Sequence, residues 1–153
     1  MKTVRCEGIG LHSGKPVHLT LKPAPISHGI RFVRVDLPGT PGVTAQFNRV
    51  VDTSLATVIG SDGCIVSTIE HLMATFAGLS IDNALIELDA YEVPVMDGSA
   101  GHFTELITKS GIKEQGVPRH FFTLKKPIQL IDGDKSVTAY PSDRFQITCT
   151  IDF

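Results

Sequence analysis

The sequence has few of the features that would place a protein on nucleic acid or in a membrane. Its formal net charge is only −2, and no run of lysine and arginine is longer than the pair Lys125-Lys126. A nucleic-acid interface must neutralise many phosphates at once, and a polybasic membrane patch needs several clustered cations. The first seven residues lack the apolar core of a signal peptide, and no apolar run approaches the length of a membrane span. We therefore expect no nucleic-acid partner and no transmembrane segment.

Cysteine is also scarce, and its three positions, Cys6, Cys64 and Cys149, lie far apart. An odd number of widely spaced cysteines favours neither a disulfide framework nor a zinc knuckle. We expect reduced thiols, buried or half-buried, in a cytoplasmic protein. Hydrophobic residues make up 42% of the chain and charged residues 20%, a balance typical of a globular domain with a real core.

Period-two alternation of apolar and polar residues predicts a sheet with one dry face. The alternation is clearest over residues 17–22 and 84–89. The turn at residues 61–63, Ser-Asp-Gly, is typical of a hairpin. Strands are predicted at residues 17–22, 30–35, 57–60, 64–66 and 84–89.

Two segments have the apolar spacing of amphipathic helices, residues 68–79 and 99–110. Gly78 and Gly111 are positioned to end them. Both helices would pack their apolar stripes on the sheet. The sequence therefore predicts an α+β fold, a two-layer sandwich.

The pattern changes near Val117, after which only strands are predicted. These strands cover residues 121–124, 128–131, 136–140 and 145–151. No helix follows to cover their apolar face, and such a sheet needs packing to be stable. We expect a first domain over residues 1–116 and the truncated start of a second domain over residues 117–153.

The segment most informative about chemistry is residues 67–72, Ser-Thr-Ile-Glu-His-Leu. Ser67 followed three residues later by Glu70 is a capping box, in which Glu70 only accepts a backbone N–H. Alternatively, Glu70 takes a proton from a zinc-bound water while His71 binds the zinc. The positive potential of a helix N-terminus would keep His71 neutral and able to bind metal. On the residues alone, His71 is equally compatible with a structural or surface role.

Other candidate positions favour structural roles. Asp97 is expected to anchor a turn or cap the second helix. His12 could approach an active-site cleft, although Gly10 and Gly14 mainly indicate an irregular turn there. Gly8 and Gly10 lack the third glycine and the following helix of a dinucleotide site, which excludes that interpretation.

Several segments together resemble one family, the UDP-3-O-acyl-N-acetylglucosamine deacetylases, zinc amidases of lipid A biosynthesis in Gram-negative bacteria. The segments are residues 8–14 (GIGLHSG), 67–72 (STIEHL), 81–83 (IDN), 93–100 (VPVMDGSA), 132–135 (DGDK) and 150–153 (TIDF).

The resemblance implies a role for several of these residues. Glu70 would be the catalytic base and His71 a zinc ligand. Leu55, Lys135 and Phe153 would contact the substrate, UDP-3-O-acyl-N-acetylglucosamine. The reaction would hydrolyse its acetamide to the free amine and acetate.

The resemblance also implies an architecture. Each domain would be a β-α-α-β sandwich of the ribosomal-protein-S5 domain 2 type, with the active site between the helical layers of two such domains.

The sequence departs from the family in one respect. The family's other zinc ligands lie in a His-Lys-x-x-x-Asp arrangement in the second domain, and a further His there is the general acid. No histidine of this sequence is followed by aspartate at that spacing. A catalytic zinc usually has three protein ligands. We therefore expect the second domain of the same enzyme to be the partner of this chain and to supply the remaining zinc ligands. The alternative is that this fragment is a non-catalytic packing or sugar-nucleotide-binding module.

Overall fold

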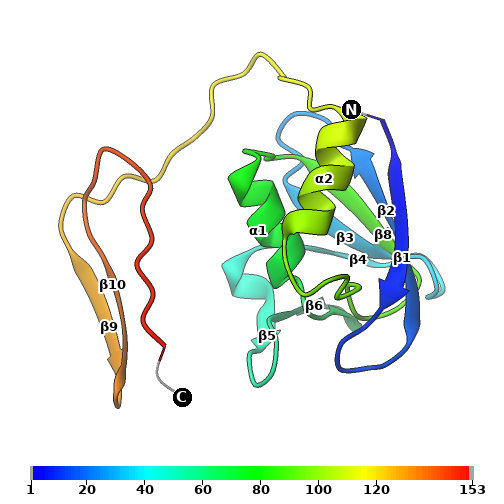
Figure 1. Cartoon of the computed structure of the whole chain (residues 1–153), viewed down its shortest axis with the longest axis horizontal. Coiled ribbons are helices and arrows are strands. Elements are labelled where there is room, and N and C mark those ends of the chain that lie inside the picture. The colour runs from blue at the N-terminus through cyan, green and yellow to red at the C-terminus, as the bar shows by residue number, and fades with distance from the viewer. Residues whose placement is uncertain (1, 152–153) are drawn as a thin grey trace. The chain divides into compact units, whose positions relative to one another are not determined.

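The protein is described by a computed structural model, which covers residues 2–151. It divides into two compact units, with the boundary between Gly116 and Val117 (Figure 1). The first unit contains both helices and two sheets, and the second unit contains one hairpin. The fold is thus mixed α+β, as predicted.

A five-stranded sheet forms the centre of the first unit, in the order β1-β2-β8-β3-β4. Neighbouring strands are antiparallel except β3 and β8, which are parallel. The strands are β1 (Val4–Ile9), β2 (Pro16–Pro23), β3 (Ile30–Arg34), β4 (Gly42–Thr44) and β8 (Ala84–Leu88).

One face of this sheet is apolar and is covered by α1 (Glu70–Gly78) and α2 (Gly101–Ser110) (Figure 1). Alternate side chains of β2 and β8 point into the core, because successive residues of a strand face opposite ways. The other face is polar, and Lys22 Nζ donates to Glu87 Oε1 there at 2.5 Å. Burial of each large core side chain stabilises the fold by about 1.5–3 kcal/mol. The fully buried ones include Leu19, Leu21, Phe32, Leu72, Phe76, Ile86, Leu88, Phe103 and Ile107.

A second sheet of three antiparallel strands leads into α1. It consists of β5 (Val50–Asp52), β6 (Val58–Ser61) and β7 (Cys64–Val66). A single 3-10 turn, η1 (Phe47–Arg49), precedes β5. Asp62 (φ 51°) and Gly63 (φ 79°) form the predicted hairpin turn. Two consecutive positive φ angles are the conformation that matches the twist of a tight hairpin.

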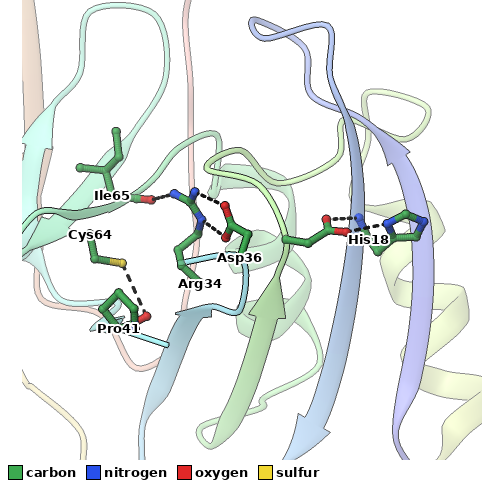
Figure 2. Close-up of polar contacts among 7 residues, drawn as sticks. His18, Arg34, Asp36, Pro41, Cys64 and Ile65 are labelled. Carbon is green, nitrogen blue, oxygen red and sulfur yellow. Dashed lines mark hydrogen bonds and ion pairs between the residues drawn. The ribbon is translucent and has the colours of Figure 1, made fainter. Parts of the chain in front are cut away.

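Arg34 connects the two sheets. It lies at the end of β3, is only 7% exposed, and forms a forked ion pair with Asp36 (Nε–Oδ1 2.7 Å, Nη2–Oδ2 2.6 Å). Its Nη1 also donates to the Ile65 carbonyl on β7 at 3.1 Å. Figure 2 shows this arrangement, with the Cys64 thiol directed at the Pro41 carbonyl beside it. The hydrogen bond from Arg34 holds the pKa of Asp36 below its ordinary value.

The predicted helices and strands of the first unit are present, with small shifts in their bounds. The structure starts α1 and α2 two residues later than predicted, and Gly111 (φ 80°) ends α2 as expected. Strands β1, β4 and β5 were not predicted. β4 and β5 have only three residues each, too few to show a period, and in β1 the alternation ends at Glu7.

The second unit contains the hairpin of β9 (Ile128–Asp132) and β10 (Lys135–Ala139), turning at Gly133 (φ 59°). The predicted strands at residues 121–124 and 145–151 are wrong. The second of these segments has the alternation of a strand, but neither has a neighbour to pair with in the described part of this unit. That residues 117–153 begin a second, similar domain stays a prediction.

The three cysteines are free thiols, as predicted. Cys6 is half-buried and Cys64 buried, and burial raises the pKa of Cys6 to about 11. Cys149 is exposed, so the expectation of burial was wrong there. The described residues contain no helix with the length and hydrophobicity that crossing a bilayer demands.

Removing the Asp36 carboxylate should alter the acid sensitivity of the fold. Because the folded-state pKa of Asp36 lies below its ordinary value of 3.8, its contribution is complete above that value. It is lost as the pH falls through the folded-state pKa. Asp36→Asn should therefore flatten the dependence of the urea unfolding midpoint on pH below about pH 4. Asp62→Asn, which removes a carboxylate from an exposed turn, controls for the loss of one charge; equal pH profiles for the two variants would contradict the prediction.

Candidate active site

The chain enters α1 through a constrained segment after β7. The Ser67 N–H donates to the Tyr91 carbonyl (2.8 Å) and the Val93 N–H donates to the Ser67 carbonyl (3.0 Å), which fixes Ser67 beside residues 91–93. Thr68 follows with φ 59° and is 5% exposed. A left-handed conformation costs a β-branched residue about 1–3 kcal/mol, so the surrounding contacts must hold it in place. This turn sets where α1 begins.

Glu70 is the first residue of α1, and its carboxylate does not cap the helix. The residue before the helix is Ile69, and no side chain there forms a capping hydrogen bond. The capping-box expectation for Ser67 and Glu70 was therefore wrong. Glu70 Oε1 instead accepts the backbone N–H of Thr57, from the loop between β5 and β6. A tertiary donor thus replaces the local one.

The surroundings of Glu70 favour its charged form. Burial by itself would raise the pKa of Glu70. The hydrogen bonds from Thr57 and the nearby His71 outweigh it and lower the pKa below the ordinary value of 4.5. The result is a fixed, ionised carboxylate at neutral pH, which can accept a proton but does so as a weak base.

His71 follows Glu70 on α1 and is partly buried. Its Nδ1 is the one buried side-chain polar atom in residues 2–151 that has no hydrogen-bond partner. Leaving a buried polar atom unpaired is costly, so it is uncommon for a histidine with only a packing role. A histidine that follows a glutamate at the start of a helix fits part of a zinc donor set. Within the described residues, no group of three His, Cys, Asp or Glu side chains could hold a metal ion.

A buried glutamate, Glu92, lies behind the entry to α1. It is 0% exposed and its two oxygens accept three hydrogen bonds. Oε1 accepts the His12 N–H (2.9 Å) and the Thr68 hydroxyl (2.9 Å), and Oε2 accepts the Ser13 N–H (2.8 Å). Burial alone would raise the pKa of Glu92, but these three donors together lower it. Glu92 thus joins the turn after β1 to the segment before α1.

Gly10 allows this close approach. A Cβ at Gly10 would overlap the Ser13 hydroxyl and the Glu92 carboxylate. The turn is closed by two backbone hydrogen bonds, from Gly10 N–H to the Lys15 carbonyl (2.9 Å) and from Gly14 N–H to the Gly10 carbonyl (3.0 Å). The irregular turn expected from Gly10 and Gly14 is confirmed, and it carries His12 to the entry of α1.

Leu55 lies in the loop that contacts Glu70. Its side chain is 82% exposed, and it stands two residues before Thr57. The loop is closed by Asp52, whose Oδ1 accepts the Ser54 N–H (3.0 Å) and the Ser54 hydroxyl (2.7 Å). An exposed apolar side chain on a loop joined to Glu70 is compatible with substrate contact, which stays a prediction for Leu55.

The other two predicted substrate contacts lie outside the first unit, and both stay predictions. Lys135 begins β10 in the second unit, where it is exposed and pairs with Asp132 across the hairpin. Phe153 lies outside the described residues. Asp97 anchors a turn, accepting the Ser99 N–H at 3.0 Å, whereas Ala100 is the residue that precedes α2. The turn expected at Asp97 is thus confirmed and the helix cap is not.

Glu92, Thr68 and Thr57 are the residues of this site that the sequence did not reveal. One signal for Glu92 was available, because a lone charge in the apolar segment of residues 90–95 needs buried donors. Thr57 acts through a backbone amide, which carries no residue-type signature. Thr68 acts through its backbone conformation and through a hydroxyl whose partner lies 24 residues away in the sequence.

Comparison with known proteins gives the family. The chain matches the family model for UDP-3-O-acyl N-acetylglycosamine deacetylase over residues 1–153. It is 51% identical over 152 residues to the UDP-3-O-acyl-N-acetylglucosamine deacetylase of Myxococcus xanthus, covering 99% of this chain and 48% of the relative. The enzyme of the same name from Saccharophagus degradans is 51% identical over 150 residues, covering 98% of this chain and 50% of the relative. The chain belongs to the UDP-3-O-acyl-N-acetylglucosamine deacetylase family, as its motifs predicted, and spans about half the length of the curated relatives it matches.

Gly10→Ala should destabilise the first unit by about 1–3 kcal/mol, because the added methyl group overlaps Ser13 and Glu92. Urea unfolding measures the change in free energy. Gly78→Ala is the matched control: it lies at the end of α1 with no heavy atom within 4 Å of the added Cβ. It should leave stability unchanged or raise it by less than about 1 kcal/mol. Similar losses in both variants would show that the Gly10 contact is unimportant.

Proposed function

We propose that this chain supplies the N-terminal part of the active site of a zinc-dependent deacetylase. The reaction is hydrolysis of the acetamide of UDP-3-O-acyl-N-acetylglucosamine to the free amine and acetate, a step of lipid A synthesis. The family membership and the names of the relatives support the substrate.

The observation that carries this proposal is the pair Glu70 and His71 at the start of α1. The Thr57 N–H fixes the Glu70 carboxylate, and burial leaves His71 Nδ1 without a partner. A carboxylate fixed by a hydrogen bond and an adjacent, partly buried imidazole with an unpaired nitrogen are compatible with a hydrolytic metal site.

In the proposed reaction, Glu70 accepts a proton from the attacking water. It is suited to this because its lowered pKa keeps it ionised at neutral pH, and its hydrogen bond from the Thr57 N–H keeps the carboxylate in place. Zinc, when bound, supplies Lewis-acid polarisation of the acetyl carbonyl and makes a weak carboxylate base sufficient. Protonation of the leaving amine requires an acid from outside this chain.

His71 is the zinc ligand that this chain contributes. A ligating histidine nearly always donates its second ring N–H to a carboxylate, carbonyl or water. The unpartnered Nδ1 is the atom that needs such a partner. The remaining ligands would come from a second domain of the same enzyme. Both domains would be β-α-α-β sandwiches of the ribosomal-protein-S5 type, enclosing the site between their helical layers.

For the chain on its own, a second function is a non-catalytic packing or sugar-nucleotide-binding module. It is favoured by the lack of any three-residue metal-ligand cluster in residues 2–151. The two functions differ in whether turnover depends on the rest of the enzyme.

Deacetylation assays distinguish them. We expect no turnover of UDP-3-O-acyl-N-acetylglucosamine by this chain with added zinc. We expect turnover by a fusion in which the remaining half of the Myxococcus xanthus deacetylase follows Phe153. Acetate release is the measurement, and the intact Myxococcus xanthus enzyme is the positive control. Binding of the substrate by a fusion that never turns over would favour the module instead.

In the active fusion, Glu70→Gln should lower kcat by about 10²–10⁴-fold, the usual range for loss of a general base. The glutamine oxygen can still accept the Thr57 N–H, so the fold should be retained and circular dichroism should be unchanged. Glu105→Gln, which alters an exposed glutamate of α2 paired with Lys109, is the control and should retain full activity. Activity of Glu70→Gln within threefold of the unsubstituted fusion would exclude Glu70 as the base.

A further inference from the structure

We propose that Glu92 is a positioning residue for the deacetylation. Its hydrogen bonds hold Thr68 and the turn that contains His12, and thereby fix the start of α1, where Glu70 and His71 lie. This inference rests on the proposed function. Glu92 contacts neither Glu70 nor His71, and it acts through the backbone that precedes them.

The first step of the argument is the choice of a charged residue at this place. Glu92 is completely buried, and a buried carboxylate is tolerated only when hydrogen bonds replace its hydration. All three donors come from segments around the site: the His12 and Ser13 amides and the Thr68 hydroxyl. A packing role would be filled more simply by an apolar side chain of the same volume.

The second step is the link from Glu92 to Glu70 and His71. Thr68 lies two residues before Glu70, in a left-handed conformation that a threonine adopts only under restraint. Its hydroxyl donates to Glu92, and no side-chain cap defines the start of α1. The start of the helix is therefore set by the entering backbone, and Glu92 restrains that backbone.

The third step concerns His12. Glu92 Oε1 accepts both the His12 N–H and the Thr68 hydroxyl at 2.9 Å, so these two donors lie within about 6 Å of each other. One carboxylate oxygen thus holds together the turn after β1 and the entry to α1. Loss of the carboxylate would release both segments, and a displacement of about 1 Å in a catalytic group can cost about 10²-fold in rate.

The test uses Glu92→Gln and Thr68→Val in the fusion that carries the remaining half of the enzyme. A glutamine has only one acceptor oxygen, so its amide would face one of the three donors. Valine keeps the shape of Thr68 but removes the hydroxyl. Thr68→Ser is the conservative variant, because it keeps the hydroxyl that donates to Glu92. Ile30→Val, in the buried face of β3, controls for a loss of stability that leaves the hydrogen bonds of Glu92 unchanged.

We expect Glu92→Gln and Thr68→Val each to lower kcat at least tenfold while KM stays within threefold, since the substrate-binding loops are unchanged. Thr68→Ser and Ile30→Val should stay within threefold of the unsubstituted fusion. The double variant should be little worse than either single one, because both remove the same interaction. Retention of kcat within threefold by both Glu92→Gln and Thr68→Val would overturn the proposal, as would a kcat loss in Ile30→Val equal to theirs.

A second readout does not depend on turnover. In the NMR spectrum of the 153-residue chain, Glu92→Gln should shift the amide signals of His12, Glu70 and His71, and leave those of β9 and β10 unchanged. Unshifted Glu70 and His71 signals would overturn the positioning role, even if the fusion proved inactive. If the unsubstituted fusion were inactive but Glu92→Gln shifted these signals in the 153-residue chain, the result would count against the proposed function. It would still support the positioning of Glu70 and His71 by Glu92. Should Glu92→Gln fail to fold, Thr68→Val decides both readouts.

Discussion

The hydrogen bonds required by one buried carboxylate, that of Glu92, determine the structure around the start of α1. A carboxylate removed from water costs several kcal/mol unless donors surround it, and Glu92 finds them in two segments that are distant in the sequence. Those segments are the turn after β1 and the approach to α1. The core of β2, β3 and β8 with the two helices stabilises the unit, but it does not by itself specify where α1 begins.

Much of the fold could be predicted, because hydrophobic periodicity reports directly on burial. The alternation of β2 and β8 corresponds to side chains that are buried and exposed in turn, and Asp62-Gly63 forms the hairpin its residue types favour. The same reasoning failed at residues 145–151, where apolar and polar residues alternate but no neighbouring strand in the described part of the second unit pairs with the backbone. A periodic pattern states what a segment can bury, whereas a strand also requires a partner.

The site could be predicted in its residue types but not in its connections. Glu70 and His71 were proposed from their motif, and their roles stay predictions. Glu70 bonds to Thr57 rather than closing the expected capping box with Ser67. Capping is a competition between donors, and the loop before β6 provides one that the local sequence does not reveal. Glu92 was missed because its partners are two backbone amides and one hydroxyl, groups that almost any residue pattern supplies.

Because of the close fit at Gly10, residues 10 and 92 cannot be substituted independently of each other. No side chain larger than hydrogen fits at position 10 while a glutamate occupies position 92 and a serine position 13. A lineage could therefore enlarge residue 10 only after shortening or redirecting its neighbours, and each intermediate would carry either a clash or an unfilled space. Gly10 has no part in the proposed reaction, yet its small size preserves the arrangement from which α1 begins.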